Sequence, residues 1–510
     1  MIDIAVLLPS IESIVNEELA KSHVPGIVVG LVNGDGLVFG KGYGLADIEK
    51  NTPMTTRTVM RWGSISKLFT CIGVFQQWER GQFQLADPVN KYLKRGKIVP
   101  KRKDWPEVTF EHLLTHTAGI GEIRRGADLL VKGFRLLTYD DKPVPALSSL
   151  HDLDLPLSAP PGSKYAYSNI GGSLLGFLTE IFSGKDFQRY MIDNVFTPLG
   201  MDDSDFAWKT RSTAPHARGY KYEKGKLRPA RIWNNIITPS GGLAATLEDM
   251  AKFASCLIKK GKHDSGQLLD PKTFDLLWTP HYWAHNSFKD CDSLGYIFRL
   301  QRLNGERIVW HTGGLSGFTS TFDILPDEGI GLITSANLSE TLSSRITLRL
   351  RHRILKVICG AENRFDPVAF APDKSWWPDM KGYYGGQPGW LSNTRVIALG
   401  LDFKVSEKEG HLILSSLFGV HKKGTKLYPT ADPLVYEYPV DDGADIDYVS
   451  RIGFIPGEQQ GKIAGLAIGD QNTLRKNTLV NTFRFKMLVI VILIAVTITL
   501  IAALDAIDFT

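Results

Sequence analysis

Three short stretches of the chain carry side chains that could together cleave an acyl bond. The first, Arg61-Trp-Gly-Ser64-Ile-Ser-Lys67, holds the only Ser-x-x-Lys of the sequence. It opens a segment whose apolar stripe predicts a helix from Lys67 to Arg80. A serine and a lysine three residues apart lie on one side of a helix. A lysine kept from water can act as base for the hydroxyl, and N–H groups at a helix start stabilise an oxyanion. The alternative is an N-cap serine beside a solvated lysine.

The second stretch places a tyrosine and an asparagine just before another predicted helix. It reads Pro161-Gly-Ser-Lys-Tyr-Ala-Tyr167-Ser-Asn169, and apolar residues at helical spacing follow it. A loop tyrosine at this point can present its phenol to a cleft and shuttle a proton. The Asn169 amide could hold a substrate carbonyl or a lysine. The alternative is a buried tyrosine with a capping asparagine.

The third stretch is a short strand that runs into glycines, His311-Thr312-Gly313-Gly314. Glycines allow a substrate backbone to approach a strand closely. The imidazole of His311 would then lie at the edge of the cleft, and the Gly314 N–H is a candidate oxyanion donor. The alternative is a surface histidine before a glycine turn.

The surrounding sequence predicts the elements that position these residues. Asn33-Gly-Asp-Gly36 and Pro326-Asp-Glu-Gly329 each separate two apolar runs and predict hairpins at 26–42 and 320–334. Thr246-Leu-Glu-Asp249 predicts the start of a helix that ends near Gly261. Strands at both ends of a largely helical region predict an α/β (α+β) fold, in which helices and a helical subdomain flank one antiparallel sheet.

Beyond this region we predict a linker, a small β-rich domain and an apolar C-terminal segment. The predicted bounds are 1–361 for the first domain, 362–379 for the linker and 380–475 for the β domain. The β domain rests on alternating runs at 395–399, 403–405 and 411–414. Residues 487–504 contain no charge and predict a single-pass transmembrane helix. Basic residues before this segment would then place the body of the protein in the cytoplasm. A buried or partner-packed helix is the alternative.

Composition narrows the class of protein. The chain has 510 residues, of which 43% are hydrophobic and 22% charged, so disordered and collagen-like classes are excluded. Its net charge of +5 is small for this length, and no nucleic-acid partner is expected. His112 and His116 have the spacing of a helical zinc pair, but no glutamate follows His112 as in metalloproteases. We expect no metal or cofactor, and local hydrogen bonding by these histidines under the catalytic site. The oligomeric state is left open.

Taken together and in this order, the three stretches resemble the serine β-lactamase and penicillin-binding-protein superfamily. The Ser-x-x-Lys motif belongs to that superfamily, and Tyr-x-Asn is similar to its class C and D-peptidase branch. Further text is similar as well, including 112–119, 197–201 and 240–243. The resemblance covers about residues 10–360. His311 stands where β-lactamases carry a lysine, a variant similar to CubicO-type esterases and D-aminopeptidases.

The resemblance implies a role for each site residue. Ser64 becomes the acylated nucleophile, Lys67 its base and Tyr167 the acid/base, while Asn169, His311, Thr312, Gly313 and Gly314 bind substrate. It implies a serine hydrolase that acts on an amide or ester of a small or peptide substrate. A β-lactamase and a transesterase are the alternatives among enzymes. A non-catalytic membrane-associated scaffold with a penicillin-binding-protein fold is the alternative of another class.

Overall fold

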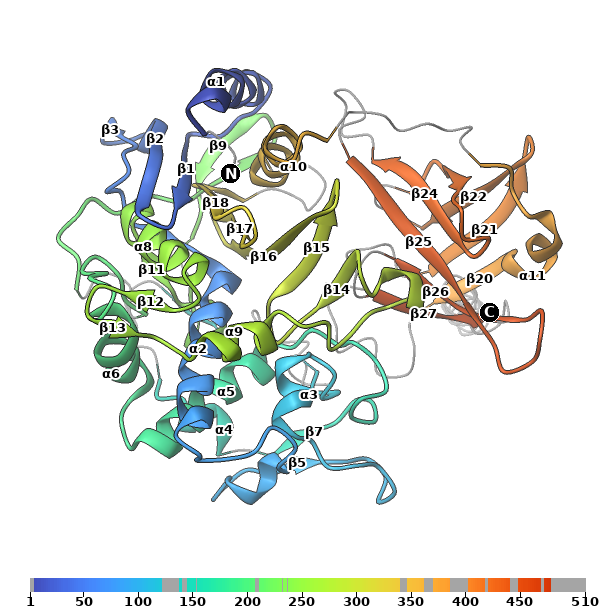
Figure 1. The fold of residues 1–510 in the computed structure, drawn as a ribbon, viewed down its shortest axis with the longest axis horizontal. Coiled ribbons are helices and arrows are strands. Elements are labelled where there is room, and N and C mark those ends of the chain that lie inside the picture. The colour runs from blue at the N-terminus through green and yellow to red at the C-terminus, as the bar shows by residue number, and fades with distance from the viewer. Residues whose placement is uncertain are drawn as a thin grey trace, which may run out of the picture. The chain divides into compact units, whose positions relative to one another are not determined.

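A computed structural model shows the arrangement of the predicted elements (Figure 1). The structure describes residues 4–121, 137–139, 145–152, 154–206, 211–231, 233–235, 237–339, 346–361, 370–385, 402–417, 421–440, 448–468 and 472–477. The chain divides into two compact units, one of Met1–Arg364 with Val440–Tyr448 and one of Phe365–Pro439 with Val449–Thr510. The bounds predicted from the sequence for domains and linker stay predictions.

The centre of the first unit is an antiparallel sheet that joins both ends of the unit. Among the described residues its strand order is β14-β15-β16-β17-β18-β1-β2-β3. Both predicted hairpins are confirmed, because β1 pairs with β2 and β17 with β18. The pairing of β1 with β18 then brings residues 27–32 beside residues 331–336. The strands are β14 Asp292–Leu294, β15 Arg299–Leu303, β16 Glu306–Leu315, β17 Phe318–Leu325, β18 Ile330–Ala336, β1 Gly26–Asn33, β2 Gly36–Asp47 and β3 Thr52–Pro53.

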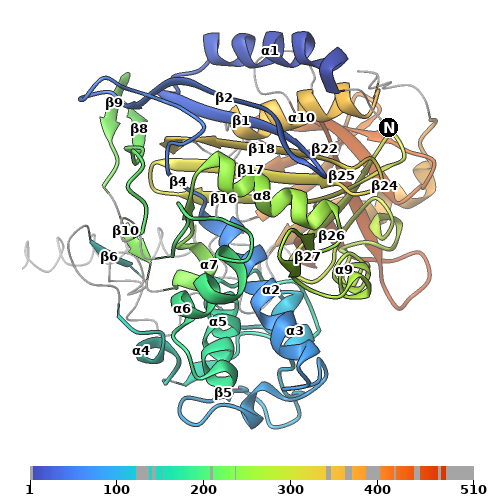
Figure 2. The same ribbon diagram turned by 60° about the vertical axis from the view of Figure 1, so that its left-hand side comes forward.

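Helices cover both faces of this sheet, which explains why its central strands β1, β17 and β18 are buried along almost their whole length. Helices α1 (Ile4–Ala20) and α10 (Ile346–Ile358) lie on one face, and α8 (Leu247–Ile258) lies on the other (Figure 2). Successive side chains of a strand point to opposite faces. Ile27, Val29 and Leu31 therefore pack in the core with α1 and α10, whereas Val28 and Val32 belong to the other core.

A largely helical region lies on the α8 side of the sheet (Figure 2). Its long helices are α2 (Ser66–Glu79) and α5 (Asn169–Ser183), which pack against each other and against α7 (Thr238–Gly241). The other helices described here are α3 Phe110–Leu114, α4 Ser148–His151, α6 Phe187–Met191 and α9 Pro271–Leu277. The predicted start of α8 is confirmed, since the Thr246 hydroxyl accepts a hydrogen bond from the Asp249 N–H at 3.1 Å.

The second unit is built on a closed β-sheet. In the described part of this unit, strands β20 to β27 follow one another in order and β20 also pairs with β27. The predicted runs at 403–405 and 411–414 lie in β21 and β22, while 395–399 lies outside the described residues. A short helix, α11 (Trp377–Met380), precedes the sheet. The strands are β20 Gly382–Gly385, β21 Asp402–Lys408, β22 His411–Ser416, β23 Thr425–Pro429, β24 Val435–Val440, β25 Tyr448–Pro456, β26 Ile463–Ile468 and β27 Asn472–Asn477.

The structure corrects the prediction of a C-terminal transmembrane helix. That helix was part of the predicted fold class and the basis of the predicted membrane location, so both are corrected with it. No helix within the described ranges is both long and apolar enough to cross a bilayer. The longest of them, α1, has 17 residues and spans about 26 Å, short of the roughly 30 Å of a hydrocarbon core. Residues 487–504 themselves lie outside the described residues. The structure therefore supports neither a single-pass C-terminal anchor nor the cytoplasmic placement inferred from it.

Candidate active site

Ser64 lies in a single tight turn that leads into α2. Strand β4 (Met60–Arg61) pairs with β11 (Ala244–Ala245), and the chain then bends at Gly63, whose φ is +55°. Residues Gly63–Ile65 form a 3-10 turn, and α2 begins only at Ser66. Ser64 therefore lies in the 3-10 turn before α2, whereas we expected it in the first turn of the α-helix itself. Its side chain still lies beside that of Lys67, because a 3-10 turn also places residues i and i+3 on one side.

Lys67 is almost fully buried, and its amine lies within hydrogen-bond distance of Asn169, Ser240 and Ser64. The Nζ atom lies 2.7 Å from Asn169 Oδ1, 2.7 Å from the Ser240 carbonyl oxygen and 3.2 Å from Ser64 Oγ. The first two neighbours can only accept hydrogen bonds. A neutral amine would use its two N–H groups for them and direct its lone pair at the serine hydroxyl. This arrangement suits a base that removes the proton of Ser64.

Tyr167 reaches the same serine from the other side. Its phenol O–H donates to Ser64 Oγ at 2.9 Å, and Lys67 Nζ lies 4.8 Å from the centre of its ring. The tyrosine is 3% exposed and precedes α5, whose N-cap Ser168 accepts a hydrogen bond from the Gly171 N–H. Asn169 is the first residue of α5, so the helix start directs its amide toward Lys67. Of the predicted residues, the structure brings these two together with Ser64 and Lys67.

The third stretch lies on β16, directly beside the turn that carries Ser64. A Cβ atom added to Gly313 would lie 1.9 Å from the Trp62 carbonyl oxygen, and one added to Gly63 would lie 2.7 Å from the Gly314 nitrogen. This close approach requires glycine. It leaves Gly314 exposed, with its N–H in the same region as Ser64. The predicted oxyanion donor is therefore beside the predicted nucleophile.

His311 shares the inner face of β16 with Gly313. Trp310, its neighbour in the strand, points the opposite way and packs on the guanidinium of Arg351 in α10, 3.7 Å from the ring centre. The imidazole Nδ1 of His311 lies 2.7 Å from the Thr312 carbonyl oxygen. A carbonyl can only accept, so Nδ1 carries the proton. Of the two neutral tautomers, this hydrogen bond selects the one with the lone pair on Nε2.

Ser240 is a site residue that the sequence reasoning did not select. Its carbonyl accepts from Lys67, and its hydroxyl donates to the Asn169 carbonyl oxygen at 2.7 Å. The available signal was its place in the Ser-Gly-Gly-Leu stretch at 240–243. That signal is weak, because the useful group is a backbone carbonyl that every residue has. Only its position in α7, packed on α2 and α5, makes it a ligand of the lysine.

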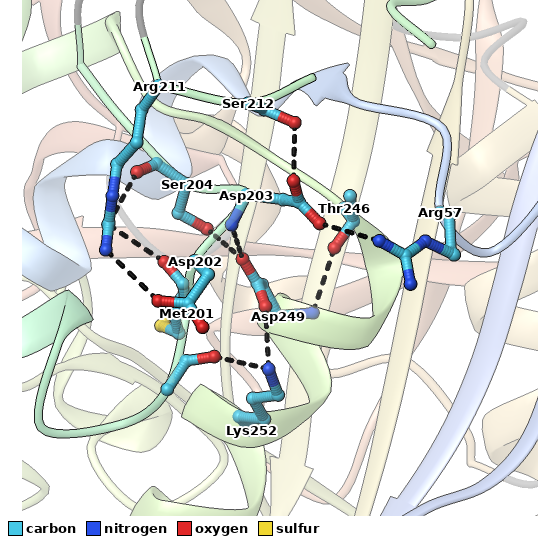
Figure 3. A network of polar contacts seen from close by, with 11 residues as sticks. Arg57, Met201, Asp202, Asp203, Ser204, Arg211, Ser212, Thr246, Asp249 and Lys252 are labelled. Carbon is cyan, nitrogen blue, oxygen red and sulfur yellow. Dashed lines mark hydrogen bonds and ion pairs between the residues drawn. The ribbon is translucent and has the colours of Figure 1, made fainter. Parts of the chain in front are cut away.

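A polar network surrounds Asp249 in the first turn of α8, close in sequence to β11, which pairs with the strand that precedes Ser64 (Figure 3). The carboxylate of Asp249 accepts from the Asp203 N–H, the Ser204 hydroxyl and Lys252 Nζ. Burial raises the pKa of Asp249 above its ordinary value. Asp205 follows and exchanges two backbone hydrogen bonds with Ala244 of β11. The network further contains Arg57, Met201, Asp202, Arg211, Ser212 and Thr246 (Figure 3).

His112, inside α3, and His116, in the turn after α3, both make local hydrogen bonds. His112 Nδ1 accepts from the Thr109 N–H at 3.1 Å and caps α3, and burial lowers the pKa of this imidazole. His116 lies behind Tyr167, with ring centres 4.4 Å apart. Within the described residues, no group of three or more His, Cys, Asp or Glu side chains could hold a metal ion.

Comparison with known proteins supports the class indicated by this geometry. The family described as Beta-lactamase matches residues 11–355. The chain belongs to the Beta-lactamase family, and the predicted resemblance to the serine β-lactamase and penicillin-binding-protein superfamily is confirmed.

Similar proteins extend this result. Over 387 residues the chain is 28% identical to the Unguisins hydrolase ungD' of Aspergillus campestris (strain IBT 28561), which covers 72% of this chain and 68% of that protein. The octameric penicillin-binding protein homologue from Pyrococcus abyssi has a TM-score of 0.58 and 23% identity, covering 92% of this chain and 100% of that one. The D-amino acid amidase from Ochrobactrum anthropi SV3 has a TM-score of 0.56 and 21% identity, covering 70% and 99%. The two solved structures show a shared fold, and family and fold together support a hydrolase.

Proposed function

We propose that this protein is a serine hydrolase that cleaves an amide or ester through an acyl-enzyme on Ser64. One observation carries the proposal: the Ser64 hydroxyl lies within hydrogen-bond distance of both Lys67 Nζ and the Tyr167 phenol. A nucleophilic serine needs an adjacent base, and a leaving group needs an acid. The same three side chains provide all of these groups in one place.

In the first half of the reaction, Ser64 Oγ attacks the carbonyl carbon of the substrate while Lys67 takes its proton. The carbonyl oxygen becomes an oxyanion, for which the N–H groups of Ser64 and Gly314 are the proposed donors; the close approach of Gly314 to Gly63 supports this pairing. The bond to the leaving nitrogen or oxygen then breaks, and Tyr167 supplies the proton that the leaving group needs. The Lys67 ammonium then gives its proton directly to the Tyr167 oxygen, because both groups lie within hydrogen-bond distance of Ser64 Oγ and therefore close to each other.

In the second half, Tyr167 takes a proton from water while its own proton passes to the neutral Lys67 amine, and the hydroxide attacks the acyl carbon. The ester bond to Ser64 breaks, and the Lys67 ammonium returns its proton to the serine oxygen. Asn169 and the Ser240 carbonyl keep the Lys67 amine in place through both halves. Asn169, His311, Thr312 and Gly313 are the groups proposed to contact the substrate.

His311 favours substrates without a carboxylate next to the cleaved bond. Its protonated Nδ1 is engaged by Thr312, and near neutral pH an imidazole supplies less positive charge than a lysine ammonium does. A lysine at this position would attract a carboxylate more strongly. We therefore favour esters and amino-acid amides, including D-amino-acid amides, over β-lactams as substrates. The amidase with a similar fold supports this choice of substrate class.

A fluorophosphonate probe tests the nucleophile. The wild-type protein should be labelled on the tryptic peptide that contains Ser64, and Ser64→Ala should abolish labelling. Ser163→Ala is the matched control, because Ser163 is exposed and its hydroxyl donates to the Pro160 carbonyl. Persistent labelling of the Ser64→Ala protein would contradict the proposal.

A substrate panel then separates the remaining activities. Matched esters, D-amino-acid amides and β-lactams with one acyl group identify the class that is turned over. Added alcohol distinguishes acyl transfer from hydrolysis, because it yields a new ester instead of an acid. A protein that takes no probe and hydrolyses no member of the panel would favour the scaffold alternative.

A further inference from the structure

His116 occupies an unusual backbone position directly behind the proposed acid/base. It follows α3 in a turn, with φ of +55°, and is only 3% exposed. Side chains other than glycine rarely adopt this left-handed conformation, although histidine does so more often than most. A residue held in this conformation and buried is over-determined by its surroundings.

The backbone and ring of His116 hold both sides of Tyr167. The His116 carbonyl accepts from the Ala166 N–H at 2.8 Å, and its Nδ1 accepts from the Ser168 N–H at 3.4 Å. These are the two residues that flank the tyrosine. The next residue of the turn, Thr117, accepts from the Gly162 N–H at 2.9 Å and so holds the beginning of the same loop.

The imidazole also restricts the tyrosine ring itself. It lies against the Tyr167 ring with centres 4.4 Å apart and planes inclined by 37°, and meets the Tyr165 ring edge-on at 5.8 Å. Tyr167 therefore has a packed surface behind it and Ser64 in front, where its phenol donates at 2.9 Å. A small shift of the ring would break that hydrogen bond.

We propose that His116 is a positioning residue for catalysis, which holds the Tyr167 phenol at Ser64 for proton transfer to the leaving group. This inference rests on the proposed function and adds to it a residue that does not touch the substrate. The acceptor at Nδ1 requires the imidazole to be neutral with its proton on Nε2, since a protonated Nδ1 would face the Ser168 N–H with a second donor. The role therefore depends on the lone pair of His116 and on its left-handed backbone.

Two substitutions separate these features. His116→Gly allows the positive φ but removes acceptor and ring. His116→Asn also tolerates the positive φ and offers an amide oxygen as a new acceptor for Ser168. Lys224→Gly is the matched control, because Lys224 has φ of +51° in an exposed turn between β8 (Tyr220–Glu223) and β9 (Lys226–Pro229). Tyr167→Phe provides the reference for a lost phenol.

The readout is the dependence of hydrolysis on the leaving group, with thermal unfolding as the test of folding. Two esters of one acyl group are compared, a p-nitrophenyl ester that leaves without a proton and an ethyl ester that needs one. His116→Gly should lower kcat/KM, which reports the acylation step, by about 10–100-fold for the ethyl ester and by less than about 3-fold for the p-nitrophenyl ester. His116→Asn should restore most of the ethyl ester activity, and Lys224→Gly should match the wild type.

Equal losses for both esters, or no loss for either, would overturn the positioning role, because a general structural defect does not distinguish leaving groups. If His116→Gly does not fold, His116→Asn carries the test, since asparagine tolerates the positive φ and supplies an acceptor: its ratio of ethyl to p-nitrophenyl ester activity should stay close to that of the wild type, and an equal loss for both esters would overturn the role. Failure of the proposed function looks different: the wild type would then not be labelled at Ser64, or Ser64→Ala would still hydrolyse both esters. That result overturns the proposed function and this inference together.

Discussion

Replacing Asn169 by aspartate tests whether the charge state of Lys67 controls acylation. The substitution is nearly isosteric and places a carboxylate oxygen where the amide oxygen now lies, 2.7 Å from Lys67 Nζ. The fold should tolerate it, because residue 169 begins α5 and a negative charge at a helix start is favourable. A carboxylate at this distance stabilises the ammonium form of the lysine, which cannot accept the proton of Ser64.

The expected shift follows from the distance. Two unit charges 2.7 Å apart attract with about 1.5 kcal/mol in water and about 6 kcal/mol at an effective dielectric constant of 20. At 1.36 kcal/mol per unit, the pKa of the lysine should rise by at least about one unit and by at most about four. At a pH below this pKa, acylation should slow about tenfold for each unit of the shift, because only the neutral amine accepts the proton of Ser64. The rate should recover as the pH rises to the new pKa.

The assay is the second-order rate of fluorophosphonate labelling at Ser64, measured from pH 5 to 10. The rise of rate with pH should move to higher pH in Asn169→Asp. Asn33→Asp is the matched control, because it adds the same charge in the exposed β1–β2 turn, where its side chain accepts from the Asp35 N–H. An unmoved pH profile in a folded Asn169→Asp protein would refute the role of Lys67 as the base.

Two further predictions concern the glycine contact of the site and the second unit. Gly313→Ala should slow Ser64 labelling at least about 100-fold, because the added Cβ would lie 1.9 Å from the Trp62 carbonyl oxygen and must displace β16. Gly34→Ala is the control and should have no effect, since the nearest neighbour of its added Cβ lies at 3.7 Å. Equal labelling rates for the two variants would contradict the packing argument. Burial lowers the pKa of His421 from 6.5 to about 4. Between these pH values the imidazole stays neutral in the folded protein but binds a proton in the unfolded chain. The unfolding free energy of this unit should therefore fall by up to about 3 kcal/mol between pH 6.5 and 4. Urea unfolding followed by hydrogen exchange in β22 and β23 measures this loss, and His421→Gln should remove it.

The elements of the fold were largely predictable because they depend on local patterns. The turn residues at 33–36 and 326–329 predicted the two hairpins, and the stripe of apolar residues after Lys67 predicted α2. The exact start of α2 was not predictable, because the bend at Gly63 depends on the close approach of Gly314, which lies on a strand far away in the sequence. The transmembrane prediction rested on the hydropathy of one segment, and the structure does not support it.

The chemical content of the site was determined by the sequence alone: a serine and a lysine three residues apart, a tyrosine two residues before an asparagine, and a histidine ahead of glycines. Only the tertiary structure decided that the hydroxyl, amine and phenol meet, and that the Ser240 carbonyl and His116 serve them. The physical reason is that the residue type alone determines which functional group a side chain carries. The direction of a backbone carbonyl, or of a ring packed behind another ring, depends on how distant segments pack.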